Sequence, residues 1–299
     1  MPTMTESYVN KRNLLFCGFI LIAVLMCYMP LKNLLSTSSN REYYSHILLI
    51  PFVSVYLLYI KRKEIYSDKS YSFGAGGALI LIGIILYILG QIHGINLNSN
   101  DYSSLITFSA VVLLSGAFIF TYGICAFRKA LFPILFLLFI VPIPSFLMER
   151  LIHFIRVGST ELANLLLIAT GVPFFRDGFF FHLSTLSVEV AKQCSGIRSC
   201  LALFITALLA GHLFLNTGWN KTILAVCVLP IAMFKNGIRI VTLTLLGAYV
   251  DPRILKSSIH REGGIPFFIL ALLLLVPILY FLRKMEKNKE SRNKVKGTR

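Results

Sequence analysis

The chain has 299 residues, of which 56% are hydrophobic and only 14% are charged, and its mean hydropathy is +0.75. Water-soluble proteins carry about a quarter charged residues, so this composition excludes a soluble fold and indicates an integral membrane protein. The net charge of +16 does not indicate nucleic-acid binding, because the basic residues lie at the ends of long apolar runs.

Eight apolar segments are long enough to cross a bilayer, which requires roughly 20 residues in each helix. Lys and Arg are abundant in the loop at residues 61–69, whereas the loop at residues 93–104 contains neither. Because Lys and Arg accumulate in cytoplasmic loops, both termini are predicted to be cytoplasmic, which requires an even number of spans. We predict one polytopic domain over residues 1–299 in the cytoplasmic (inner) membrane, with a basic cytoplasmic tail at 283–299. The predicted spans are residues 14–31, 44–60, 75–92, 104–124, 129–147, 195–215, 221–249 and 265–282.

A further segment, residues 149–171, is apolar but carries a polar residue at every third or fourth position, which is the spacing of one helix face. A ninth span would move the basic tail to the outside, so we predict an amphipathic or re-entrant helix at the outer surface. Two interpretations of its polar stripe stay open, a solvated face and the lining of a polar cavity. The stripe consists of Glu149, His153, Arg156, Thr160 and Asn164.

Residues 174–193 combine the pair Asp177-Gly178 with an alternation of polar and apolar residues at 185–190. An Asp-Gly pair between apolar runs favours a hairpin turn, and period-two alternation favours a strand. The sequence therefore predicts a small β-hairpin within a protein that is otherwise of the all-α integral membrane class. A hairpin at the membrane surface suits the delivery of a residue to a site or the docking of a peptide.

Cys194 lies where the hairpin region ends and a predicted span begins. At a helix start, the helix dipole and the free backbone N–H groups favour a thiolate over a thiol. The N–H groups of the turn through Ser195 and Gly196 are candidates to bind an oxyanion, and Arg198 adds positive charge one turn later. A membrane cysteine considered alone is more often a packing residue.

Asn236 and Arg239 lie inside the long predicted span at residues 221–249. An arginine at hydrocarbon depth is costly and usually faces a cavity or a partner, so Arg239 is a candidate to hold an anion or a carbonyl. The other interpretation is an arginine that snorkels to the outer interface.

His260, followed by Gly264, precedes the last span. Histidine can move protons near neutral pH, although a lone loop histidine is usually solvated.

Together these residues supply what acyl transfer through a thioester requires. Cys194 attacks a carbonyl, His260 moves protons, and Arg239 holds the oxyanion or an acidic group of the substrate. The sequence lacks the His-Glu-x-x-His of metalloproteases, the Gly-x-Ser-x-Gly of serine hydrolases and paired intramembrane aspartates. No metal and no organic cofactor is implied.

Three motifs in the same order resemble those of the exosortase and archaeosortase family of membrane-embedded cysteine transpeptidases. They are Cys194-Ser195-Gly196-Ile197-Arg198, Asn236-Gly237-Ile238-Arg239-Ile240, and His260 with Gly264 and Phe268. The resemblance covers roughly residues 130–270, which would form the catalytic core. It implies an active site of Cys194, Arg239 and His260 at the outer face. The candidates for substrate-binding or supporting roles are Ser195, Gly196, Arg198, Asn236 and Gly264.

The resemblance also implies a class of substrates: secreted proteins that end in a short motif, a transmembrane helix and a basic cluster. Cleavage near the motif would pass the acyl group to an acceptor that the sequence does not identify. The alternative is a transporter or a lipid-linked carrier, in which Arg198 and Arg239 bind an anionic head group. A polysaccharide polymerase of the envelope is a further alternative, although such a protein would need larger outer loops.

Overall fold

A computed structural model describes residues 4–36, 47–65, 72–251, 253 and 264–297. The chain forms two compact units, Met1–Met148 and Glu149–Arg299, and each is described by itself. The described residues are almost entirely helical apart from one small sheet, which confirms the predicted all-α membrane class. In the described segments, seven helices are long and apolar enough to cross a membrane: Lys11–Pro30, Phe73–His93, Ser99–Lys129, Ser145–Ala169, Lys192–Phe214, Gly218–Tyr249 and Ile265–Lys289.

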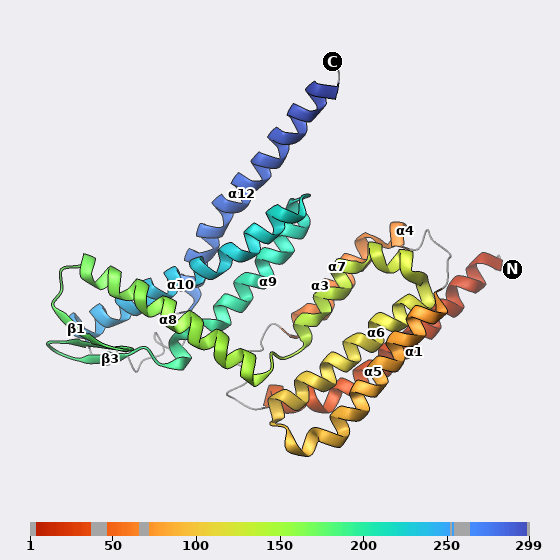
Figure 1. Ribbon diagram of the computed structural model, residues 1–299, viewed down its shortest axis with the longest axis horizontal. Helices are drawn as coiled ribbons and strands as arrows, with labels where there is room; N and C mark the ends of the chain where they lie inside the picture. The colour runs from red at the N-terminus through yellow and green to blue at the C-terminus, as the bar shows by residue number, and fades with distance from the viewer. Residues whose placement is uncertain (1–3, 37–46, 66–71, 252, 254–263, 298–299) are drawn as a thin grey trace. The chain divides into compact units, whose positions relative to one another are not determined.

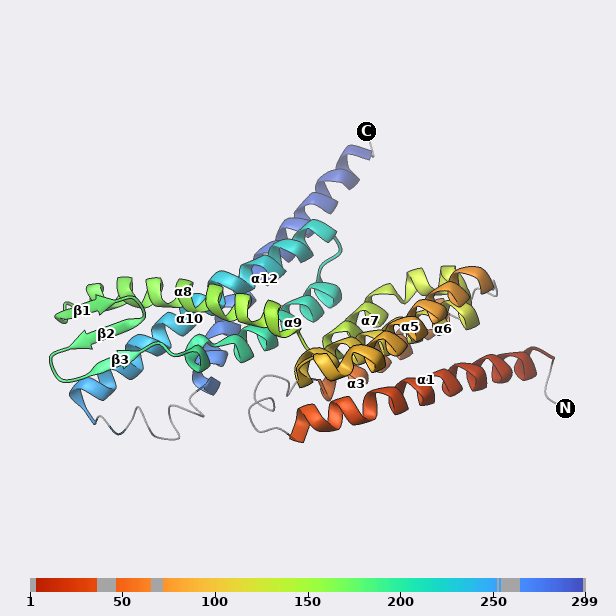
Figure 2. The same cartoon turned by 60° about the horizontal axis from the view of Figure 1, so that its bottom comes forward.

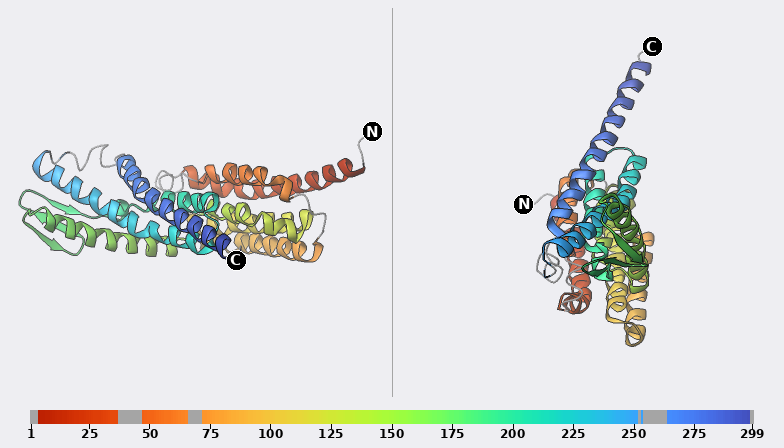
Figure 3. Two further views of the ribbon diagram at one scale, coloured as in Figure 1. Left: turned by 90° about the horizontal axis from the view of Figure 1, so that it is seen from above. Right: turned by 90° about the vertical axis from the view of Figure 1, so that its left-hand side faces the viewer.

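The first unit is a helical bundle in which three long helices, α1, α5 and α6, run side by side (Figure 1, Figure 3). Its elements are α1 (Met4–Ser36), α3 (Leu49–Ile60), α4 (Arg62–Ile65), α5 (Phe73–His93), η1 (Gly94–Asn96), α6 (Ser99–Lys129), α7 (Leu131–Phe136) and η2 (Leu137–Ile140).

Glycines spaced seven residues apart let α5 and α6 approach each other closely. Gly76, Gly83 and Gly90 are the buried residues of α5. A Cβ atom at Gly83 would lie 2.9 Å from the backbone nitrogen of Leu113 on α6, which is closer than any side chain can pack. Small residues at such an interface bring helix backbones into direct contact, and this packing contributes to helix association inside a bilayer.

The span predicted at residues 129–147 is not one continuous helix. It consists of α7 and η2, and the backbone then becomes extended at Val141. Pro142 and Pro144 explain the break, because proline lacks the N–H that a helix needs and disfavours helical backbone in the residue before it. The described part of the span predicted at 44–60 is the short helix α3.

The second unit begins within α8 (Ser145–Ala169). Its other elements are β1 (Phe174–Asp177), β2 (Phe180–Leu183), β3 (Ser187–Glu189), η3 (Lys192–Ser195), α9 (Ile197–Phe214), α10 (Gly218–Tyr249) and α12 (Gly264–Gly297). The helix predicted at 149–171 is therefore present as α8. It is long and apolar enough to cross a membrane, so its predicted place at the outer surface stays a prediction.

The predicted β-hairpin is confirmed, and a third strand extends it into an antiparallel sheet with the order β1-β2-β3 (Figure 2). Asp177 pairs with Phe180, which leaves a two-residue turn whose first residue, Gly178, has φ +54°. Glycine adopts this backbone without a steric penalty. Phe181 of β2 is fully buried in a hydrophobic cluster that also contains residues of α8 and α10, so the sheet packs against both helices.

An ion pair also joins the sheet to α8. Both terminal nitrogens of Arg176 donate to the Glu161 carboxylate, at 2.6 and 3.0 Å. This charged hydrogen bonding raises the pKa of the Arg176 guanidinium above its ordinary value.

At the start of α10, far along the helix from the sheet, the carboxylate of Glu286 joins α12 to the loop between α9 and α10. It accepts hydrogen bonds of 2.9 Å from the backbone N–H groups of Asn216 and Thr217 and from the side-chain amide of Asn220. The first backbone N–H groups of a helix have no partner within it, and a carboxylate there also interacts favourably with the helix dipole. Glu286 thus fixes the two residues before α10, where the side chain of the N-cap residue, Thr217, makes no capping hydrogen bond of its own.

Candidate active site

Cys194 lies in the short 3-10 turn η3, between the sheet and α9. The turn ends at Gly196, and α9 begins at Ile197, so Cys194 precedes the helix by three residues. Its backbone N–H donates to the carbonyl oxygen of Ala191 at 2.9 Å and is therefore not available to a substrate oxyanion. The side chain is half-buried, and all six cysteines of the chain are free thiols.

Asn236, near the middle of α10, holds this turn in place. Its Nδ2 donates to the carbonyl oxygens of both Cys194, at 3.0 Å, and Ser195, at 3.1 Å. Asn236 is fully buried, its bond to Ser195 is buried and its bond to Cys194 is partly buried, and leaving a carbonyl without a donor in such a place is costly. In the part of the chain that the structure describes, Asn236 Oδ1 and the buried Ser195 Oγ have no hydrogen-bond partner.

Gly196 makes the close approach of α10 to this turn sterically feasible. Its φ is +76°, in the left-handed region, and a Cβ atom there would lie 2.8 Å from Asn236 Oδ1. Any other residue would combine an unfavourable backbone with a collision against the side chain that holds Cys194.

Lys235 connects α10 to the first turn of α9. Its side chain is only 1% exposed, and Nζ donates to Ser199 Oγ, which in turn donates to the carbonyl oxygen of Gly196 at 2.9 Å. The turn that carries Cys194 is therefore connected to α10 on both sides of Gly196. The sequence showed Lys235 inside a predicted span but gave no indication of this role.

Three charged side chains act electrostatically on the Cys194 thiol: Arg239, Glu189 and Arg156. Arg239 is half-buried on α10, one turn beyond Asn236. Its guanidinium is placed so that it stabilises negative charge at Cys194 or in a group bound beside it. Arg198, in contrast, is exposed on the first turn of α9.

Arg156 of α8 holds the segment between β3 and Cys194. Its Nε donates to the carbonyl oxygen of Val190, one terminal nitrogen lies 3.2 Å from a Glu189 carboxylate oxygen, and the guanidinium lies 3.7 Å from the centre of the Phe179 ring. Arg156 belongs to the predicted polar stripe, and at this position the stripe faces the sheet. The helical spacing of the stripe marked Arg156 as unusual, but nothing in the sequence paired it with Glu189.

The structure thus brings together five of the predicted site residues: Cys194, Ser195, Gly196, Asn236 and Arg239. Gly264 is the first residue of α12. His260 lies outside the described residues, and its predicted role stays a prediction. No three His, Cys, Asp or Glu side chains gather as metal ligands within the described segments.

Replacing Asn236 by leucine is expected to lower activity by about 10- to 100-fold, because the carbonyl oxygens of Cys194 and Ser195 lose their donor and the turn that carries the thiol is no longer held. The measurement is substrate turnover per amount of folded protein in membranes. Asn164→Leu makes the same substitution at a half-buried position of α8 and serves as the control. Unchanged turnover in Asn236→Leu would show that the two hydrogen bonds do not position Cys194.

The fold and the site define a polytopic helical membrane protein with a half-buried cysteine that is held by an asparagine and lies near an arginine. The family model described as transmembrane exosortase matches residues 38–277, and the chain belongs to this family. No curated protein and no solved structure matches the chain. Membership places the chain among membrane transpeptidases with a general role in protein sorting.

Proposed function

We propose that this chain cleaves the C-terminal sorting signal of secreted proteins through a thioester at Cys194 and transfers the cleaved protein to an acceptor in the cell envelope. The observation that carries the proposal is the arrangement around Cys194: Asn236 fixes the turn, and the charge of Arg239 acts on the thiol. A thiol that only packed between helices would need neither a positioned turn nor a neighbouring cation.

In this mechanism, the Cys194 sulfur attacks the scissile carbonyl carbon and gives its proton to His260. The C–N bond then breaks, and the leaving amine takes the proton from His260 while the acyl group stays on Cys194 as a thioester. An acceptor nucleophile attacks the thioester and restores the thiol. Arg239 stabilises the oxyanion or binds the acidic residue of the sorting motif.

The substrates in this proposal end in a short motif, a transmembrane helix and a basic cluster. The enzyme lies in the cytoplasmic membrane with both termini in the cytoplasm and Cys194 toward the outer face. Cleavage there leaves the helix and the basic cluster of the signal in the bilayer and passes the exported domain to the acceptor. The reaction needs no cofactor.

The test is to trap the acyl-enzyme in membranes. A secreted reporter with a sorting signal is co-expressed with the chain, membranes are denatured in acid to preserve thioesters, and the adduct is mapped by mass spectrometry. We expect a reporter adduct on Cys194 that hydroxylamine releases, with Cys227→Ser as a control that keeps the adduct. Turnover of the reporter with no adduct on Cys194, under conditions that slow the acceptor step, would contradict the thioester mechanism.

A carrier of anionic head groups is the second candidate, and one observation favours it. Lys235 is a buried cation, and no carboxylate among the described residues pairs with it. Cations at such depth often mark a path for anionic substrates. A carrier does not need the Cys194 thiol, so substitution of Cys194 distinguishes the two functions.

A further inference from the structure

Lys235 and Asn236 are consecutive residues of α10, and both side chains reach the turn that carries Cys194. Asn236 Nδ2 donates to the carbonyl oxygens of the two residues before Gly196. The next carbonyl oxygen, that of Gly196, accepts a hydrogen bond of 2.9 Å from Ser199 Oγ, which itself accepts one from Lys235 Nζ. Three successive carbonyl oxygens of the turn are therefore held from α10, the first two directly and the third through a serine.

The ammonium group of Lys235 lies directly against the turn. A Cβ atom at Gly196 would lie 3.4 Å from Lys235 Nζ, and the lysine is only 1% exposed. Within the described segments, Ser199 Oγ is the one acceptor that Nζ has, and no carboxylate pairs with it. Burying a cation with so little compensation is costly, and an ionisable residue at this depth usually has a role beyond packing. A methionine would fill a similar space without this cost.

We propose that Lys235 is a positioning residue for the reaction at Cys194. It acts through Ser199, and the hydrogen bond that Ser199 gives to Gly196 fixes the start of α9 directly after the thiol. The consequence for turnover rests on the proposed function, whereas the consequence for the thiol itself does not. The competing role for Lys235 is to bind an anion on the path of a carrier, and that role gives Ser199 no part.

The first test compares turnover of a sorting-signal reporter, per amount of folded protein, in Lys235→Met, Ser199→Ala and the double variant. Each single variant is expected to lower kcat by about 10-fold with little change in KM, because the contacts to substrate stay while the thiol is displaced. The double variant should lose no more than Lys235→Met alone, since both changes break the same chain of hydrogen bonds. Ser199→Ala also tests this chain in a protein that keeps its buried lysine.

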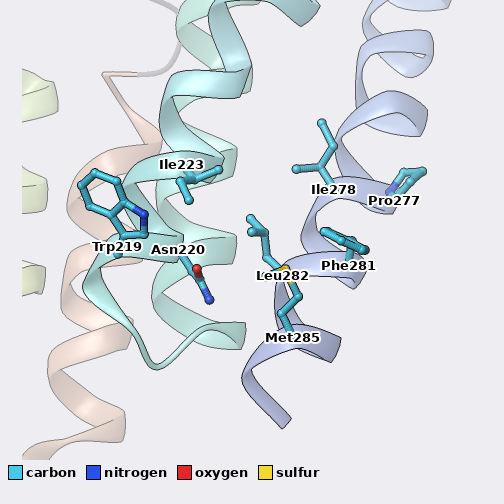
Figure 4. A pocket seen from close by; sticks show the side chains of 8 residues that line it. All are labelled: Trp219, Asn220, Ile223, Pro277, Ile278, Phe281, Leu282 and Met285. Atoms are coloured by element: carbon cyan, nitrogen blue, oxygen red, sulfur yellow. The ribbon is translucent and has the colours of Figure 1, made fainter. Parts of the chain in front are cut away.

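Lys221→Met is the matched control, because it makes the same substitution toward the other end of α10. Lys221 is half-buried, and the nearby residues Asn220 and Ile223 line an apolar groove between α10 and α12 (Figure 4). It precedes Lys235 by 14 residues, which corresponds to about 21 Å along the helix. Turnover in this control is expected to stay at the wild-type level.

The second test measures the position of the thiol without turnover, so its result stands whether or not the chain processes the reporter. The full chain in membranes is treated with iodoacetamide, and alkylation of each cysteine is followed by mass spectrometry. In Lys235→Met and in Ser199→Ala, Cys194 is expected to react at least about threefold faster than in the wild type, because a turn that is no longer held opens more often. Cys227, which is also half-buried, should keep its rate.

Unchanged alkylation of Cys194 in both variants would overturn the proposal, since the turn would then keep its position without Lys235. A raised KM in Lys235→Met together with normal turnover in Ser199→Ala would also overturn it, in favour of a cation that binds an anion. A parallel rise in the alkylation of Cys194 and Cys227 would indicate a general loosening of the helices and would contradict a specific role at the turn.

Discussion

Replacing Cys194 by serine or alanine is expected to abolish processing of a sorting-signal reporter, with a loss on the order of a thousandfold or more. Serine preserves the size of the side chain and the hydrogen bonds that Asn236 gives to the backbone, which do not involve the thiol. A serine hydroxyl is far less acidic than a thiol, so it is a much weaker nucleophile at neutral pH. The measurement is the shift in reporter mobility on membranes that contain equal amounts of each variant.

The matched control is Cys227→Ser, which makes the same chemical change at a half-buried position of α10. Loss of processing in Cys194→Ser together with normal processing in the control would assign the chemistry to Cys194. Retained activity in both Cys194 variants would remove this residue from the reaction and favour the carrier function. The experiment therefore separates the two candidate functions without knowledge of the acceptor.

Gly196→Ala is expected to lower turnover by about 100-fold, although the substitution adds one methyl group and touches no reacting atom. The left-handed backbone at φ +76° costs alanine roughly 1–2 kcal/mol. The new Cβ atom also displaces Asn236, and the carbonyl oxygens of Cys194 and Ser195 then lose their donor at a further cost of roughly 1–3 kcal/mol. The measurement is turnover of the reporter, together with the yield of folded protein after detergent extraction.

Gly218→Ala is the control for this substitution. Gly218 lies at the start of α10, its backbone is not left-handed, and a Cβ atom there would have no neighbour within 4 Å. Equal turnover in Gly196→Ala and in this control would show that the turn tolerates a shift of Asn236. The position of Cys194 would then not depend on Asn236.

Composition and apolar length predicted the membrane class and most of the long helices, because hydrocarbon requires each spanning backbone to satisfy its own hydrogen bonds. The hairpin was also predictable, since Asp177-Gly178 determines the turn locally. The break after η2 was the main error of helix assignment. The span was assigned from the length of its apolar run, although Pro142 and Pro144 within it already indicate a break in the helix.

The candidate site was only partly predictable. Cys194, Asn236 and Arg239 stood out by residue type and depth, but the two hydrogen bonds from Asn236 depend on how closely α10 approaches the turn. The pairing of Arg156 with Glu189 likewise joins residues 33 positions apart, on a helix and on a strand. Such contacts are set by tertiary packing, which the periodicity of a single chain does not contain.

The hydrogen bonds that Glu286 accepts from the loop between α9 and α10 bear on the order of assembly during synthesis. Glu286 follows Asn216 by 70 residues, so at roughly 5–20 residues per second it is added about 4–14 s after the loop that it binds. During that interval the start of α10 lacks its carboxylate, and the N–H groups of Asn216 and Thr217 depend on water. The loop between α9 and α10 is therefore fixed only when the last helix arrives, and a chain that stopped before Glu286 would lack these three hydrogen bonds.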